Sequence, residues 1–188
     1  MKRRPRPTLI ERRVAKDGTA LEIMAPARIV TMLRPRHVRE LASWSPLLRR
    51  HGEEDAAWDW RAIIAEHRSD AKRRFESFGV VCRGQLQAAM IVGCGPHRSR
   101  VSGDPLAYVE YLASAPWNRP AIANPPTFKG AGSLMMAAAI QWSMSIGCAG
   151  ALGLHAKPRA AGFYIRLGFR DFGADPQESG LHYMELNT

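Results

Sequence analysis

A lysine and two glycines stand directly before a run of helix-favouring residues, in the stretch PPTFKGAGSLMMAAAIQW at positions 125–142. The first turn of a helix leaves backbone N–H groups unpaired and carries partial positive charge, so it attracts anions. Glycine lets the backbone approach a phosphate closely because it has no Cβ. Lys129 adds a formal charge, and Ser133 adds a hydroxyl. Taken alone, the stretch fits either a pyrophosphate-binding loop or a hinge that starts a helix.

Two well-known phosphate loops are disfavoured by the spacing of these glycines. The Walker pattern requires a lysine after its second glycine, but Ser133 follows Gly132. The dinucleotide fingerprint GxGxxG would require a glycine where Met135 stands. The loop therefore argues against a nucleotide hydrolase and a dehydrogenase.

A second motif lies downstream, in KPRAAGFYIRLGFRDFG at positions 157–173. Its Ala160, the pair Phe163-Tyr164 and the run 167–169 resemble the closing motif of the GCN5-related N-acetyltransferase (GNAT) family, roughly N-x-R-A-x-x-F-Y-x-x-x-G-F. The stretch 127–132 resembles the same family's acetyl-CoA loop, R/Q-x-x-G-x-G/A. Both motifs occur in the family's order, and the resemblance extends over about 78–186.

The chain departs from the family pattern at two positions. Thr127 stands where arginine or glutamine is usual, and Lys157 stands where asparagine is usual. Lys129 and Lys157 could supply the missing positive charge near the phosphates of a cofactor.

The resemblance implies acetyl-CoA as co-substrate. Backbone amides of 129–133 would hold the pyrophosphate, and the free edge of 112–114 would pair with the pantetheine arm as an added strand does. The implied cofactor-binding residues are Leu112, Ala113, Ser114, Phe128, Lys129, Gly130, Ala131, Gly132, Ser133 and Lys157.

Tyr164 occupies the family's position for the general acid that protonates the coenzyme A sulfur. A phenol with a pKa of about 10 is protonated at neutral pH and can donate to a thiolate whose acid has a pKa of roughly 8.5. The alternative is a core aromatic packed beside Phe163.

Glu110 is the candidate base, because a carboxylate inside the otherwise apolar strand YVEYLAS is costly to bury unless it is paired. Binding a cationic amine and a salt bridge to arginine are alternative roles. His155, at a strand end, could relay a proton, and Trp117 and Asn118 could line the acceptor pocket or only pack the loop. Strand alternation predicts one face with Tyr108, Glu110 and Leu112 and another with Val109, Tyr111 and Ala113.

Alternating strand and helix patterns must position these residues. Extended segments are expected at 19–33, 75–94 with a turn at Arg83-Gly84, 107–114, 150–156, 169–173 and 181–187. Helices are expected from Pro35, over 55–75 with an acidic start and a basic end, over 132–146 and over 158–168. This predicts an α/β (α+β) fold with a mixed, mostly antiparallel central sheet flanked by helices. The resemblance implies a sheet splayed between the strands at 107–114 and 150–156.

The composition predicts a folded protein of one main domain. The 188 residues, 46% of them hydrophobic, suit a single domain over 20–188, and the seven Lys or Arg within 2–16 suggest a basic, flexible arm over 1–19. No apolar run approaches the length of a membrane span, so we expect a cytoplasmic protein with no membrane partner. Three cysteines without CxxC spacing predict no metal site.

The sequence therefore predicts an acetyl-CoA-dependent N-acetyltransferase that transfers acetyl directly to a primary amine. A small-molecule acceptor is favoured. The net charge of +10 keeps a tRNA or protein acceptor in view, and an aminoacyl-tRNA-acetylating toxin-like enzyme and a non-catalytic acyl-CoA sensor are the alternatives. A nucleic-acid-binding module that uses the basic arm is a third class, and the resemblance leaves room for a homodimer.

Overall fold

The structure is a computed structural model and describes residues 6–187. Along this part of the chain the elements are β1 (Thr8–Val14), β2 (Ala20–Thr31), α1 (Pro35–Arg50), α2 (Trp60–Ser69), β3 (Arg74–Cys82), β4 (Gln85–Arg98), β5 (Pro105–Ser114), the 3-10 turn η1 (Pro116–Asn118), β6 (Phe128–Lys129), α3 (Ala131–Ser145), β7 (Leu152–Ala156), α4 (Ala161–Arg166), β8 (Arg170–Asp175), η2 (Pro176–Glu178) and β9 (Leu181–Leu186). No described helix is both long and apolar enough to cross a membrane.

One sheet of nine strands organises the chain, in the order β6-β1-β2-β3-β4-β5-β7-β9-β8. Every neighbouring pair is antiparallel except β5 and β7, which are parallel. The predicted mixed, mostly antiparallel sheet is confirmed. The turn that joins β3 and β4 is also as predicted, because Arg83 and Gly84 both have positive φ, as a two-residue hairpin requires.

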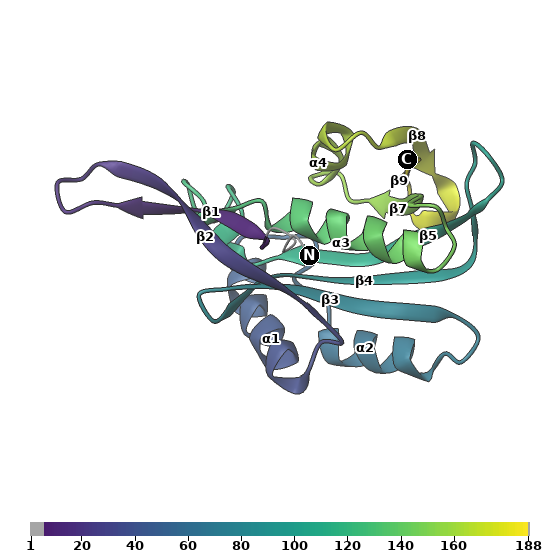
Figure 1. The fold of residues 1–188 in the computed structure, drawn as a ribbon, viewed down its shortest axis with the longest axis horizontal. Coiled ribbons are helices and arrows are strands. Elements are labelled where there is room, and N and C mark those ends of the chain that lie inside the picture. The colour runs from purple at the N-terminus through teal and green to yellow at the C-terminus, as the bar shows by residue number, and fades with distance from the viewer. Residues whose placement is uncertain (1–5, 188) are drawn as a thin grey trace, which may run out of the picture.

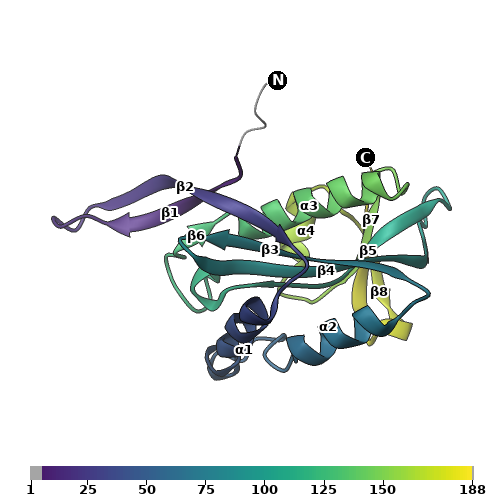
Figure 2. The same ribbon diagram turned by 60° about the horizontal axis from the view of Figure 1, so that its bottom comes forward.

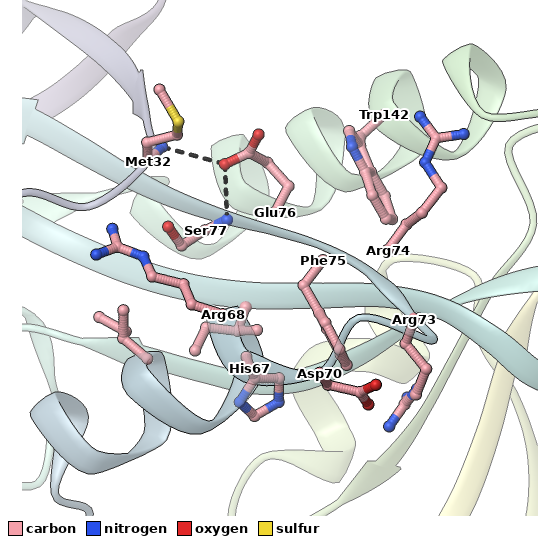
Figure 3. A pocket seen from close by; sticks show the side chains of 12 residues that line it. Met32, His67, Arg68, Asp70, Arg73, Arg74, Phe75, Glu76, Ser77 and Trp142 are labelled. Atoms are coloured by element: carbon pink, nitrogen blue, oxygen red, sulfur yellow. Dashed lines mark hydrogen bonds between the residues drawn. The ribbon is translucent and has the colours of Figure 1, made fainter.

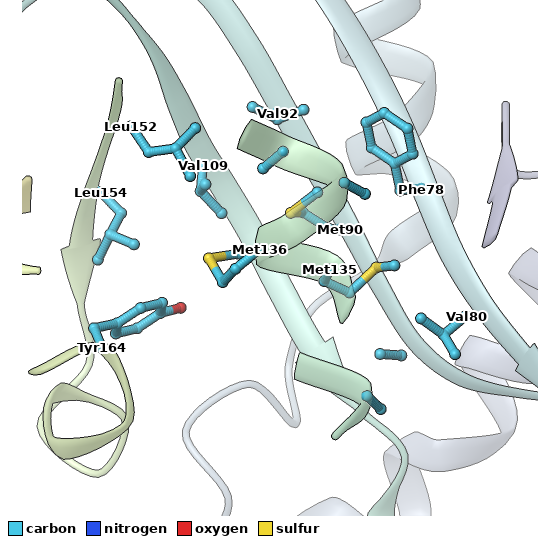
Figure 4. Packing of buried hydrophobic residues seen from close by; sticks show 14 of the residues in the cluster. Phe78, Val80, Met90, Val92, Val109, Met135, Met136, Leu152, Leu154 and Tyr164 are labelled. Carbon is cyan, nitrogen blue, oxygen red and sulfur yellow. The ribbon is translucent and has the colours of Figure 1, made fainter. Parts of the chain in front are cut away.

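Helices cover both faces of this sheet. Helices α1 and α2 lie on one face, whereas α3 lies on the other with α4 near its end (Figures 1 and 2). Each side has its own apolar core. Met135 and Met136 of α3 pack against Met90 and Val92 of β4 (Figure 4), while Trp44, Trp60 and other apolar side chains of α1 and α2 pack against the opposite face.

The second helix is shorter than predicted. It begins at Trp60, because the side chain of Asp59 accepts hydrogen bonds from the backbone N–H groups of Arg61 and Ala62 and so caps it. The acidic run 53–55 precedes the helix, its Glu53 and Asp55 pair with Arg119, and Arg74 already belongs to β3. The acidic start and basic end of the segment 55–75 therefore did not predict where α2 begins and ends.

The predicted flexible arm over 1–19 is wrong for residues 8–14, and residues 1–5 lie outside the described part. Strand β1 pairs with β2 along its whole length, and the two form a hairpin that projects from the body (Figure 1). Leu9 is buried in the core beneath α3 and fixes the strand there. Glu11 pairs with both Arg13 and Arg83, so part of the arm's basic charge is neutralised within the fold.

The sheet opens between β5 and β7, as predicted. Only Ala107 and Tyr108 of β5 pair with Leu152 and Gly153 of β7. Beyond Tyr108 the two strands diverge, so the β5 edge from Val109 to Ser114 has no strand partner on that side among the described residues. This opening is where a ligand can reach the middle of the sheet.

Candidate functional site

A pocket of about 530 Å³ occupies the opening between β5 and β7. Its walls come from β5, β7, α4, the segment before α2 and the β8–β9 connection. The lining residues are Trp58, Arg73, His97, Tyr108, Val109, Glu110, Tyr111, Leu112, Leu154, His155, Lys157, Ala160, Tyr164, Glu178 and Leu181. The structure thus brings Glu110, His155 and Tyr164, which lie far apart in the sequence, to one cavity.

A β-bulge at Glu110 changes the direction of the side chains along β5. Tyr111 pairs with Ile91 of β4 and Val109 pairs with Val92, so Glu110 is the extra residue that no β4 residue faces. The predicted alternation is therefore wrong beyond this point. Leu112 lies on the α3 face with Val109, not with Tyr108 and Glu110.

The Glu110 carboxylate forms an ion pair with the guanidinium of Arg73, which precedes β3. Both side chains are largely buried, with 16% and 27% of their surface exposed. The salt-bridge role considered from the sequence is thus the one that the structure shows. Taking up a proton at Glu110 would break this pair, which weakens the prediction that Glu110 acts as the base.

Tyr164 lies in α4 with its ring beside Leu154 of β7, at the edge of the core beneath α3 (Figure 4). Only 7% of the residue is exposed, and no hydrogen-bond partner of its hydroxyl is found among residues 6–187. Burial raises the pKa of Tyr164 far above that of a free phenol. The pocket therefore contains a phenol that stays protonated at every physiological pH and has a proton free to donate.

A hydrogen-bonded chain links Tyr108 and His155, which line the pocket, to Asp175 at the end of β8. The Tyr108 hydroxyl bonds His155 Nδ1, and His155 Nε2 lies 3.3 Å from Asp175 Oδ2. Neither Tyr108 nor Asp175 was predicted as a site residue. No local sequence pattern predicts this series of hydrogen bonds. The three residues lie far apart in the sequence, and only the pairing of strands in the sheet brings β5, β7 and the end of β8 together.

The glycine loop begins α3 as predicted. Gly130 is its N-terminal cap in the left-handed conformation (φ 95°), which glycine adopts without strain. The backbone N–H groups of 131–133 lie in the first helical turn, where no intrahelical acceptor is available. A Cβ at Gly130 would meet only Leu9, at 3.8 Å, so the approach to this helix end is open on that side.

Both lysines predicted to supply charge near the phosphates bond other groups of the protein. Lys129 Nζ bonds Glu22 Oε1 at 2.7 Å, because the β6 strand directs the side chain toward the β1–β2 hairpin. Lys157 Nζ bonds the carbonyl of Glu54 at 2.9 Å and lies 5.3 Å from the centre of the Trp58 ring. Lys157 therefore closes one end of the pocket and ties β7 to the segment before α2.

The connector after β5 has a structural role. The Ser114 carbonyl accepts two hydrogen bonds from the Arg119 guanidinium, which leaves this atom of the predicted cofactor edge already occupied. The indole of Trp117 and the amide of Asn118 both bond Gln87 Oε1. Trp117 and Asn118 are absent from the pocket lining, so the loop-packing interpretation holds for them.

Gly132 is required by a close contact between α3 and α4. A Cβ here would lie 2.9 Å from Cζ of Phe163, so we expect Gly132→Ala to lower the free energy of unfolding by about 1–3 kcal/mol through overpacking. Urea denaturation measures this change. Gly162→Ala is the matched control, because its new methyl group would meet only Arg166, at 3.5 Å. Combining Gly132→Ala with Phe163→Leu should restore part of the lost stability. Equal stability of Gly132→Ala and Gly162→Ala would contradict this packing.

A second cavity, of about 450 Å³, lies between α2 and α3 beside residues 74–77 of β3, which extend beyond the pairing of β3 with β2 (Figure 3). Arg68, Arg74 and Trp142 contribute to its walls. Glu76 closes one side, since its Oε1 accepts hydrogen bonds from the backbone N–H groups of Met32 and Ser77 (Figure 3). None of the predicted site residues lies in it.

Comparison with solved structures identifies the fold. No model of a protein family matches the chain, and no curated protein sequence matches it. A tandem GNAT protein from the clavulanic acid biosynthesis pathway is similar over 82% of this chain (TM-score 0.59, 15% identity), and the chain spans 51% of that protein. The Bacillus subtilis N-acetyltransferase YlbP in complex with coenzyme A is similar over 86% of this chain and 97% of its own (TM-score 0.56, 12% identity).

A third similar structure is the PaiA N-acetyltransferase from Thermoplasma acidophilum in complex with coenzyme A. It is similar over 86% of this chain and 99% of its own, with a TM-score of 0.55 and 14% identity. These likenesses confirm the resemblance at the level of the fold: the chain has the fold of the GNAT acetyltransferases.

Proposed function

We propose that the protein is an acetyl-CoA-dependent N-acetyltransferase that acetylates a primary amine by direct attack. One observation carries the proposal: the unpaired edge of β5 and the buried phenol of Tyr164 line one opening in the sheet, and the glycine-led start of α3 packs against α4, the helix that carries Tyr164. The helix start suits the pyrophosphate of acetyl-CoA, the β5 edge suits its pantetheine arm, and the Tyr164 phenol suits its thioester sulfur. Similarity to two proteins with coenzyme A bound supports the same ligand here.

The binding residues are proposed from this geometry. The backbone N–H groups of 131–133 hold the pyrophosphate, and Leu112 and Ala113 on the open β5 edge pair with the pantetheine amides. Lys129 adds only distant positive charge, because Glu22 already engages it. Bound acetyl-CoA supplies the acetyl group as a thioester, and Tyr164 gives its proton to the departing sulfur.

The acceptor is proposed to be a small molecule with a primary amine. Tyr111 and Trp58 offer aromatic surface, with their ring centroids 5.0 Å apart, and Glu178 places a carboxylate at the pocket rim. Such a wall suits the apolar body of an amine, and the carboxylate favours its cationic form before deprotonation. A peptide N-terminus and the aminoacyl end of tRNA present the same group, so both belong in the assay panel.

The test is calorimetric binding of acetyl-CoA to variants at Gly130. The left-handed conformation tolerates both asparagine and aspartate, so Gly130→Asn and Gly130→Asp differ chiefly in charge. We expect Gly130→Asp to bind at least about tenfold more weakly than Gly130→Asn, because its carboxylate opposes the phosphates at the helix start. Equal affinities, or no binding by the wild type, would refute the proposed cradle.

Turnover is tested separately by release of free thiol from acetyl-CoA across a panel of amines. Acetyl-CoA binding with no release for any amine would identify a sensor and not an enzyme. Release with aminoacyl-tRNA alone would identify the toxin-like alternative.

A further inference from the structure

We propose that Tyr108 is the group that removes the proton from the acceptor amine, and that it passes its own proton to His155, which Asp175 orients. The inference rests on the proposed acetyltransferase function and assigns its base. Glu110, the base predicted from the sequence, is already held by Arg73. The Tyr108 hydroxyl lies in the same pocket and already contacts a proton acceptor.

The chain of hydrogen bonds has a defined direction. Asp175 Oδ2 lies 3.3 Å from His155 Nε2 and accepts its N–H, so the neutral imidazole presents the lone pair of Nδ1. The Tyr108 hydroxyl bonds this nitrogen and donates to it. An amine beside the Tyr108 hydroxyl can therefore give its proton to the hydroxyl oxygen while the hydroxyl proton moves to His155 Nδ1.

Asp175 is well fixed for its orienting role. Its carboxylate accepts a hydrogen bond from the backbone N–H of Gln177 at 3.0 Å and pairs with Arg100 at 2.7 Å. The Gln177 N–H, then the His155 contact and Arg100, hold the pKa of Asp175 below its ordinary value. Asp175 therefore stays ionised at neutral pH, and its carboxylate can only accept a hydrogen bond from the imidazole.

Burial determines how Tyr108 operates. It raises the pKa of Tyr108 far above that of a free phenol, and the nearby Glu110 and Glu178 raise it further. A standing tyrosinate is thus excluded, and the hydroxyl must take up one proton as it releases another. His97 stacks on the ring, with centroids 4.1 Å apart and planes 15° from parallel, and fixes its position.

The step balances without any other reactant. The amine nitrogen forms a bond to the thioester carbon and the carbon–sulfur bond breaks; the nitrogen's proton goes to Tyr108 Oη, and the proton of Tyr108 goes to His155 Nδ1. Tyr164 donates its proton to the sulfur. The imidazolium then loses a proton to solvent and Tyr164 regains one, so the products are the amide and the free thiol.

Ionisable groups from several elements face this chain, so its pH dependence belongs to the whole set. They are Glu110 on β5, His97 on β4, Arg73 before β3, Arg100 after β4, Asp175 at the end of β8, Glu178 in the β8–β9 connection, and Tyr183 on β9. Burial lowers the pKa of His97, which keeps that ring neutral.

The experiment compares kcat across pH for the wild type and for Tyr108→Phe, His155→Gln, Asp175→Asn and Glu110→Gln, with one amine throughout. We expect Tyr108→Phe and His155→Gln to lose about 10²-fold in kcat. Asp175→Asn should lose about tenfold or more, because the amide favours the wrong tautomer. Tyr183→Phe is the control: its ring is 5.0 Å from His155, but its hydroxyl bonds Glu185, so kcat should change less than twofold.

A readout independent of turnover is the ¹⁵N spectrum of the His155 ring, in which the wild type should carry its proton on Nε2 and Asp175→Asn should not. We expect all these variants to bind acetyl-CoA as tightly as the wild type does. A measurement of this affinity therefore distinguishes failure of the relay from failure of the proposed function. If the wild type turns over but Tyr108→Phe retains its rate and pH profile, or if only Glu110→Gln is inactive, the relay is refuted. If the wild type neither binds acetyl-CoA nor turns over, the proposed function itself fails.

Discussion

Tyr164→Phe is expected to lower kcat by about 10³-fold while leaving the affinity for acetyl-CoA unchanged. The reason is burial. With 7% of the residue exposed, water has little access to the place where the thiolate leaves, and an unprotonated thiolate is poorly solvated there. The ring remains in Tyr164→Phe, so the packing against Phe163 and Phe169 is preserved.

The pH dependence gives a second check on this residue. Because burial raises the pKa of Tyr164, the wild-type phenol keeps its proton beyond pH 10. Deprotonation of Tyr164 should therefore cause no fall in kcat at basic pH, and the basic side of the pH profile should have the same shape in the wild type and in Tyr164→Phe. Thiol release under saturating acetyl-CoA measures kcat, and calorimetry measures affinity. A fully active Tyr164→Phe enzyme would make Tyr164 a packing residue only.

Arg119→Ala is expected to lower the free energy of unfolding by about 3–5 kcal/mol. The guanidinium bonds Glu53 at 2.8 Å and also pairs with Asp55, and the three side chains are only 13%, 10% and 8% exposed. Removing it leaves two buried carboxylates side by side and takes two hydrogen bonds from the carbonyl of Ser114. Chemical denaturation followed by tryptophan fluorescence measures the loss.

Arg159→Ala is the matched control for Arg119→Ala, because Arg159 pairs with the same Glu53 carboxylate at 3.4 Å but is 60% exposed. An exposed pair contributes at most about 1 kcal/mol, and less in salt. We therefore expect a clear difference between the two variants. Equal losses would show that burial does not strengthen the Arg119 network.

Patterns within single segments predicted the elements well. The β3–β4 turn at Arg83-Gly84 and the start of α3 at a glycine loop follow from backbone conformations that neighbouring residues dictate. The limits of α2 were wrong because one capping side chain, Asp59, outweighed the charges on either side. Pairing of β1 in the sheet was missed because the seven basic residues within 2–16 obscure the apolar anchor Leu9.

The sequence alone determined the fold family that the chain resembles, the glycine loop before α3 and Tyr164 as the candidate acid, since short motifs and local periodicity carry those signals. Only the tertiary structure decided which groups meet: Lys129 with Glu22, Glu110 with Arg73, and Tyr108 with His155 and Asp175. The order of the strands in the sheet and a one-residue bulge in β5 determine which of these side chains come into contact. Both depend on contacts between residues far apart in the chain, and no local pattern encodes the partner of a side chain across a sheet.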